Sequence, residues 1–324
     1  MCTSLSMYHG IFGRNLDLHV SFGQQIVITP RNYPFHFQKA PVLSSHAAII
    51  GTATVMQNYP LYAEAMNEHG LYMAGLNFPG NADYDQKADG QGPLITPFEL
   101  IPWILGQCEN IQQAKQLLSN FQIRNEPFSP QMPLAPLHWQ IADAQHTLVC
   151  EIMTDGIHVY DDPIGVLTNN PPFPFHQMNI RQYRHLSAHQ QQNTFTAETD
   201  LSPFCEGMGA IGLPGDASSP SRYVKAAFLK SNAPEEKNEE DQIIQFFHIL
   251  DAVSMVKGSV LSDEKQYDLT LYSCAISKKT KTYYYKTYHN NQIHCLCMND
   301  VDLNGDRLTA IPMIDQPQFD HIQP

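Results

Sequence analysis

The residue best suited to chemistry is the cysteine that directly follows the initiating methionine. Because Met1 precedes a small residue, the sequence predicts its removal, which leaves Cys2 with both a thiol and a free α-amino group. The thiolate is the nucleophilic form of cysteine, and an ordinary thiol, with a pKa of ~8.5, is mostly protonated at neutral pH. An α-amino group, with a pKa of ~7.7–8.0, can take that proton, so one residue supplies nucleophile and base. Position alone does not distinguish Cys2 from an ordinary terminal residue.

Two charged residues lie one short hairpin away from Cys2. The second strand of this hairpin reads Phe12-Gly-Arg-Asn-Leu-Asp17. On a strand, Arg14 and Leu16 face one way, and Asp17 faces the other. A cation beside the thiol would stabilise the thiolate, and a carboxylate would hold the protonated α-amine. Without Cys2, these charges would be a surface ion pair of little consequence.

Three other motifs lack the context that their chemistry needs. Gly207-Met-Gly-Ala-Ile-Gly212 matches a dinucleotide fingerprint, but no strand precedes it and Leu213-Pro-Gly215 stops a helix. Asp300-Val-Asp-Leu-Asn-Gly305 opens like a calcium loop, yet Ile311 stands where the bidentate glutamate belongs. His294-Cys-Leu-Cys297 has no further ligands in view, so we predict core cysteines there. We therefore expect no metal ion and no cofactor, and we reject a nucleotide-binding oxidoreductase.

The predicted elements are grouped rather than alternating. Helices are predicted to begin at Thr96, Ile111 and Ser219, with a further apolar stripe from Ile243 to Val253, and the acidic stretch 232–242 reads as a solvated loop. The grouping favours an α+β fold, in which helices cover antiparallel sheets, over an alternating parallel sheet. Strands are predicted at 3–8, 11–18, 25–29, 47–56, 70–76, 139–142, 148–152, 157–160, 164–168, 269–277, 281–288 and 292–298.

Composition excludes several classes of protein. The 324 residues carry 19 Lys+Arg and 32 Asp+Glu, a net charge of −13, which disfavours nucleic acids and anionic membrane surfaces as partners. No apolar run reaches the ~18 residues of a membrane span, and the first residues do not resemble a signal peptide. Seven scattered cysteines are typical of free thiols in a reducing cytoplasm. No repeat or composition break appears, so we predict one domain over residues 1–324.

The motifs around Cys2 resemble the cholylglycine hydrolase family of N-terminal nucleophile amidases, which comprises conjugated bile acid hydrolases and penicillin V acylases. The resemblance includes Met1-Cys-Thr3 and the segment 12–17, and it runs in order along nearly the whole chain. It is also carried by Thr29-Pro-Arg-Asn-Tyr-Pro34, Met66-Asn-Glu-His-Gly-Leu71, Ala74-Gly-Leu-Asn-Phe-Pro79, Leu137-His-Trp139, Gly165-Val-Leu-Thr-Asn-Asn-Pro171, Gly212-Leu-Pro-Gly-Asp216, Ser221-Arg222, Phe246-Phe-His-Ile-Leu250 and Tyr283-Tyr-Tyr285.

This resemblance implies a fold and a mechanism. The fold would be a four-layer αββα sandwich of two antiparallel sheets. Cys2 would attack an amide carbonyl and form a thioester, with Arg14 beside the thiol and Asp17 beside the α-amine. Asn77 and Asn169 would contribute to the oxyanion hole, and Arg222 would complete the charged network. The resemblance also implies a homotetramer.

The substrate class follows less directly. Asn at position 77 resembles the bile acid hydrolases, whereas penicillin V acylases more often carry Tyr there, so we expect glycine- or taurine-conjugated bile salts. The alternatives are penicillin V, another acyl amide such as an acyl-homoserine lactone, and an inactive protein that only binds acyl groups. The expected apolar walls of the substrate pocket are Leu16, Met56, Phe128 and Met132.

Overall fold

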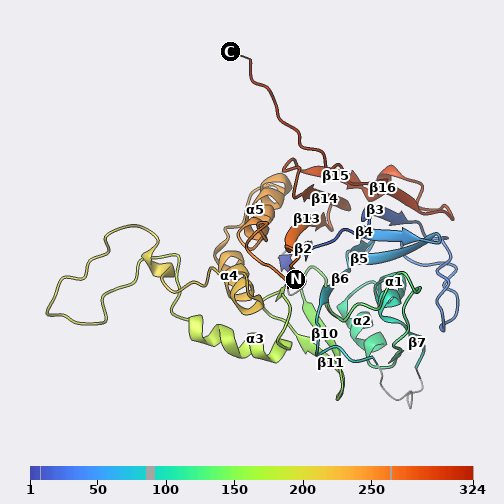
Figure 1. Ribbon diagram of the computed structural model, residues 1–324, viewed down its shortest axis with the longest axis horizontal. Coiled ribbons are helices and arrows are strands. Elements are labelled where there is room, and N and C mark those ends of the chain that lie inside the picture. Colours follow the sequence, from blue (N-terminus) through green and yellow to red (C-terminus); the bar gives the residue numbers. More distant parts are fainter. Residues whose placement is uncertain (8, 85–91, 263–264, 324) are drawn as a thin grey trace.

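Two antiparallel sheets dominate the computed structural model, which describes residues 1–7, 9–84, 92–262 and 265–323 (Figure 1). The six-stranded sheet has the order β12-β1-β2-β13-β14-β15, and the eight-stranded sheet has the order β11-β10-β9-β6-β5-β4-β3-β16. The first contains β1 (Cys2–Met7), β2 (Ile11–Leu18), β12 (Val166–Leu167), β13 (Leu269–Ser277), β14 (Thr282–Thr287) and β15 (His294–Cys297). The second contains β3 (Gln25–Thr29), β4 (Ile49–Met56), β5 (Tyr59–Asn67), β6 (Tyr72–Asn77), β9 (Leu137–Ala142), β10 (Thr147–Met153), β11 (Gly156–Asp161) and β16 (Thr309–Pro312).

Helices cover the outer faces of both sheets. One layer packs on the eight-stranded sheet through α1, and the other packs on the six-stranded sheet through α4 and α5 (Figure 1). The predicted αββα sandwich is therefore confirmed. The helices are α1 (Leu100–Gln107), α2 (Ile111–Leu118), α3 (Phe173–Asn179), α4 (Ser219–Asn232) and α5 (Glu239–Asp251), with short 3₁₀ turns η1 (Pro97–Glu99), η2 (Ile180–Tyr183), η3 (Met208–Ala210) and η4 (Met298–Asp300). A small parallel pair joins β7 (Leu94–Ile95) to β8 (Gln122–Ile123).

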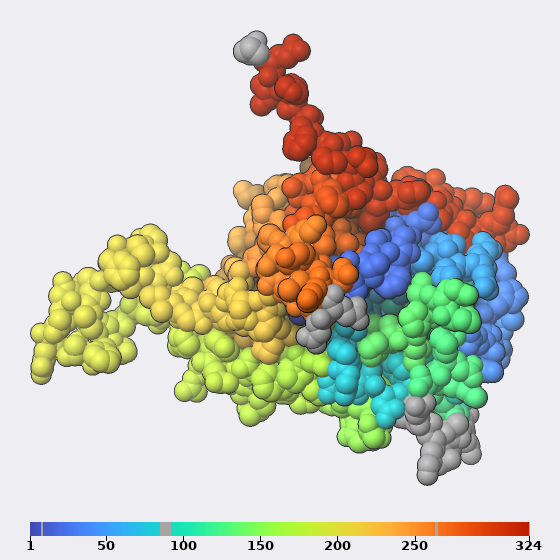
Figure 2. Space-filling view, viewed as in Figure 1, coloured from blue at the N-terminus to red at the C-terminus, as the bar shows by residue number. Residues whose placement is uncertain are grey.

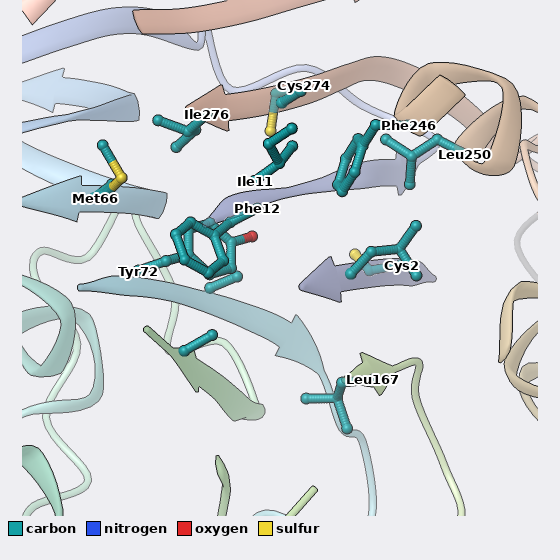
Figure 3. Packing of buried hydrophobic residues seen from close by; sticks show 14 of the residues in the cluster. Cys2, Ile11, Phe12, Met66, Tyr72, Leu167, Phe246, Leu250, Cys274 and Ile276 are labelled. Carbon is teal, nitrogen blue, oxygen red and sulfur yellow. The ribbon is translucent and has the colours of Figure 1, made fainter. Parts of the chain in front are cut away.

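The core between the sheets includes the first residues of the chain. Phe12 of β2 and Tyr72 of β6 stack with their ring centroids 5.3 Å apart, and Cys2 belongs to the same buried cluster (Figure 3). A Cβ atom at Gly13 would lie 2.0 Å from the Cys274 carbonyl oxygen, so only glycine lets β2 approach β13 this closely. The close approach fixes the position of Arg14, the next residue along.

The structure corrects the sequence predictions at β5, at the 232–242 loop and at the two cysteines of β15. Strand β5 was missed because both of its faces are largely buried and it carries Pro60, so it lacks alternation. The predicted loop 232–242 ends early, since Asn238 caps α5 by accepting from the Asp241 amide at 2.8 Å. Cys295 is exposed and Cys297 is only half-buried because β15 is an edge strand, so neither is a core cysteine.

Candidate active site

The register of the first hairpin sorts the charged residues around Cys2. Cys2 pairs with Leu16, and Ser4 pairs with Arg14, so these four side chains share one face of the six-stranded sheet. Asp17 lies on the opposite face, where its backbone pairs with Met1. The strand pairing therefore places Arg14 and Asp17 on opposite faces of the sheet, as the sequence predicts.

Arg14 is fully buried and is held mainly by backbone carbonyl groups. Nη1 donates to the carbonyl oxygens of Gly75 at 2.5 Å and Ala63 at 3.3 Å. Nη2 has no hydrogen-bond partner within the described residues, and Arg14 lines the same cavity as Cys2. Burial would lower the pKa of Arg14, but the nearby Cys2 and Glu64 outweigh burial and raise it, so the guanidinium stays charged.

Asp17 is a buried carboxylate near the start of the chain. Its Oδ1 accepts from the Thr270 hydroxyl at 2.6 Å, and its backbone oxygen accepts from the Met1 amine at 2.5 Å. Burial raises the pKa of Asp17, while Arg222, the chain terminus and Thr270 oppose that rise. The structure therefore gathers Asp17, Arg222 and the N-terminal backbone into one charged cluster.

Asn169 connects this cluster to the opposite sheet. Its Oδ1 accepts from the Cys2 backbone N–H at 2.8 Å and from Arg222 Nη2 at 2.7 Å, while its Nδ2 donates to the Asn77 carbonyl oxygen at 2.7 Å. Arg222 also donates to the carbonyl oxygen of Cys2 and to Thr3 Oγ1 at 2.6 Å. All six predicted catalytic residues thus lie around the start of β1.

The backbone of Asn169 is fixed by residues that sequence reasoning missed. Its N–H donates to Ser219 Oγ at 2.8 Å, and its carbonyl oxygen accepts from His176 Nε2 at 3.0 Å. Burial lowers the pKa of His176, which favours the neutral ring. Ser219 begins α4 and His176 belongs to α3, so two helices orient one asparagine.

An apolar cavity of about 330 Å³ opens above Cys2. Asn77, the last residue of β6, lines it together with Arg14, and the Asn77 side-chain amide forms no hydrogen bond within the described residues. Phe98 and Phe128 line the far wall and contact each other edge to face, with their ring centroids 5.3 Å apart. Such a cavity suits an apolar acyl group whose carbonyl carbon lies at the thiol.

The structure brings three of the four predicted wall residues to this cavity. Leu16, Phe128 and Met132 line it, whereas Met56 does not. Met56 is the last residue of β4 and pairs with Tyr59 beside the turn that joins β4 to β5, so it lies beyond Thr54, the lining residue of that strand. The prediction for Met56 is therefore corrected.

The rejected motifs hold no comparable site. The glycine pattern at 207–212 forms only the turn η3, and the described residues between η2 and η3 include no strand that leads into it. Among the described residues, no group of three or more His, Cys, Asp or Glu side chains is arranged to hold a metal ion. Within those same residues, no helix combines the length and apolar character needed to cross a bilayer.

A sandwich of two antiparallel sheets with a buried cysteine at the start of an inner strand defines the class of the N-terminal nucleophile hydrolases. Residues 2–311 match the family model of the linear amide C–N hydrolases, choloylglycine hydrolase family. The chain belongs to this family, and it is a linear amide hydrolase.

Named relatives and solved structures agree with this assignment. The chain is 44% identical to a bile salt hydrolase/transferase of Lactiplantibacillus plantarum, over 98% of this chain and 99% of that protein. It is 36% identical to a bile salt hydrolase/transferase of Clostridium perfringens, over 99% of this chain and 100% of that protein. The solved conjugated bile acid hydrolase from Clostridium perfringens superimposes with a TM-score of 0.91 at 34% identity, covering 99% of this chain and 100% of that one.

A more distant structure shares the fold alone. Penicillin V acylase from Agrobacterium tumefaciens matches with a TM-score of 0.76 at 18% identity, covering 96% of this chain and 90% of that one.

Proposed function

We propose that this protein hydrolyses the amide bond of glycine- and taurine-conjugated bile salts, with Cys2 as the nucleophile. The observation that carries the proposal is the apolar cavity that ends at Cys2, Arg14 and Asn77. A bile salt conjugate joins an apolar steroid to an anionic amino acid through an amide. The apolar cavity suits the steroid, and the polar end suits the amide. Relatives that match along the full length of the chain bear the same activity in their names.

The first chemical step requires Cys2 to be the N-terminal residue. With Met1 in place, the Cys2 nitrogen is an amide and cannot accept a proton. Once Met1 is removed, that nitrogen becomes an amine, whose N–H would point at Asn169 Oδ1 as the present N–H does. Its lone pair is then free to take the thiol proton. The thiolate attacks the amide carbonyl carbon, and Arg14 stabilises the negative sulfur.

Collapse of the tetrahedral intermediate gives a thioester. The protonated amine of Cys2 returns its proton to the leaving nitrogen, and the free amino acid departs. Asn77 would donate its unpaired side-chain amide to the oxyanion. Asn169 would contribute by holding Asn77 and the Cys2 amine, because its own Nδ2 is engaged at the Asn77 carbonyl. Water, activated by the same amine, then hydrolyses the thioester.

Penicillin V or another acyl amide remains the alternative substrate for the same chemistry. The paired rings of Phe98 and Phe128 would accept a phenyl group as well as a steroid face. Asn at position 77 favours the bile salts, because penicillin V acylases more often carry Tyr there.

The assembled protein would be a cytoplasmic homotetramer in which each chain forms one domain. The support for self-association is the arm, residues 184–218, which projects from the body between η2 and α4 (Figure 2). Phe195 is 90% exposed and Phe204 is 85% exposed on this arm. Exposed rings on a projecting segment favour burial against another copy of the chain.

The support for a cytoplasmic location is that all seven cysteines are free, which suits a reducing compartment.

Intact mass and alkylation test the nucleophile. Purified protein should lack Met1, and iodoacetamide should modify Cys2 fastest among the seven cysteines, with glycocholate slowing that reaction. Retention of Met1 in fully active protein, or full activity after alkylation of Cys2, would overturn the proposal.

A further inference from the structure

A second buried charge lies behind Arg14 and has no part in the steps above. Glu64 of β5 is fully buried, and its Oε2 lies 3.8 Å from Arg14 Nε. The guanidinium therefore has two sides. Its Nε atom faces the Glu64 carboxylate, while its Nη2 atom has no hydrogen-bond partner within the described residues. Arg14 lines the same cavity as Cys2.

Glu64 is held by hydroxyl groups from the opposite sheet. Tyr272 of β13 donates to Oε2 at 2.7 Å, and Tyr283 of β14 donates to Oε1 at 2.9 Å. Tyr283 is in turn hydrogen-bonded to Thr52, the β4 residue paired with Glu64. Each carboxylate oxygen of Glu64 thus accepts a hydrogen bond from a tyrosine that is itself buried. The packed rings keep the two hydroxyl groups in place, and the hydroxyl groups hold the carboxylate.

A carboxylate buried at this depth is costly unless a charge or hydrogen bonds offset it. Here the offset comes from Arg14 and two hydroxyls. Burial raises the pKa of Glu64, while Arg14 and the tyrosines oppose that rise. Apart from these, the ionisable groups around Arg14 are Cys2, Tyr72, Asp17 and Cys274. Those facing Arg222 are Asp17, Cys2 and Asp268.

We propose that Glu64 is the positioning residue of this active site: it anchors Arg14 from behind and its negative charge limits how strongly Arg14 favours the Cys2 thiolate. This inference rests on the proposed function, since it requires Cys2 to react as a thiolate. It makes the reactivity of Cys2 depend on a residue that touches neither thiol nor substrate.

Glu64→Gln tests the proposal because glutamine keeps the shape and one acceptor oxygen but removes the charge. The measurement is the rate of Cys2 alkylation by iodoacetamide between pH 5 and 9, followed by peptide mass, on protein shown to lack Met1. The midpoint of this profile should fall by about 0.5 pH unit or more, since a charge within ~4–6 Å shifts a titration by ~1–3 units and a more distant one by less. An unchanged or higher midpoint would overturn the proposal, even if the variant were less stable.

Glu99→Gln is the matched control. Glu99 is also fully buried and hydrogen-bonded, to the backbone N–H groups of Thr96 and Gln38, but it does not contact Arg14. Its loss should lower the melting temperature and leave the midpoint where it was. An equal shift in this control would show that any lost buried charge has the effect, which would also overturn the proposal.

A second variant decides the matter if Glu64→Gln does not fold. Tyr272→Phe removes one hydroxyl from the carboxylate and favours its neutral form, so the midpoint should move in the same direction by a smaller amount. No shift in this variant would count against the proposal. Failure of the proposed function looks different, because Cys2→Ala would then retain turnover, whereas the alkylation profile of the Glu64 variants reports on the Cys2 thiol whether or not Cys2 is the nucleophile.

Discussion

The two ends of the cavity are built in different ways. At the polar end, Cys2, Arg14 and Asn169 are almost fully buried, and Arg14 and Asn169 are fixed by hydrogen bonds to strands or helices. At the apolar end, Phe128 and Met132 belong to the segment between β8 and β9 and are partly exposed, and Phe128 contacts Tyr59 and Phe98 through ring packing. The pairing of the strands therefore sets the positions of Cys2 and Arg14. A surface segment shapes the acyl pocket, and its sequence can change without moving these two residues.

Removal of the nucleophile is expected to have the largest effect at the polar end. Cys2→Ser should fold normally but lower kcat on the order of 10³-fold or more, because an α-amine is too weak a base to generate a serine alkoxide. Steady-state rates and circular dichroism would be measured on protein shown by intact mass to lack Met1. Near-wild-type rates would refute the thiol mechanism.

The next largest effect is expected at the junction of the two ends. Asn77→Leu should lower kcat by about 10²–10³-fold with little change in KM, because it removes an oxyanion donor rather than a pocket wall. Asn81→Leu, just beyond the same strand, is the control and should stay near wild type. A rise in KM with unchanged kcat would instead place Asn77 in substrate binding.

At the apolar end, the effect should be moderate and confined to binding. Phe128→Ala should lower kcat/KM by about 10-fold, since lost apolar contact in a pocket costs ~1–3 kcal/mol. Met56→Ala should leave kcat/KM unchanged, because Met56 does not line the cavity. Equal effects of both variants would contradict the position of the cavity.

The smallest effect concerns stability away from the cavity. Burial raises the pKa of Asp162 to about 6, so the folded chain binds its proton more tightly than the unfolded chain. Asp162 therefore contributes most stability below pH ~4 and loses that contribution as the pH rises through about 6. Asp162→Asn should raise the free energy of unfolding by about 1–2 kcal/mol at pH 7.5 and by less at pH 5. Denaturant unfolding at the two pH values measures this, and a gain that is larger at pH 5 would contradict the assignment.

The sequence itself predicted the faces of Arg14 and Asp17 because both lie on one local, regular strand, whereas Asn77, Asn169 and Arg222 were expected only from the family resemblance. The hairpin from Cys2 to Leu18 has the alternation that places Arg14 and Asp17 on opposite faces. Glu64 could not be predicted in the same way, because β5 is buried on both faces and its role depends on tyrosines more than 200 positions away. Met56 was misplaced since the bulge between Thr52 and Ala53 and the turn that follows decide where β4 leaves the cavity.

Substrate turnover tests the central claim most directly. Release of glycine and taurine from glycocholate and taurocholate should be measured beside penicillin V cleavage, with protein that lacks Met1 and under reducing conditions. We predict at least ~100-fold higher kcat/KM for a bile salt, equal to ~2.7 kcal/mol of barrier. An equal preference for penicillin V, or no amino-acid release from either bile salt by protein with a reactive Cys2, would contradict the proposed substrate.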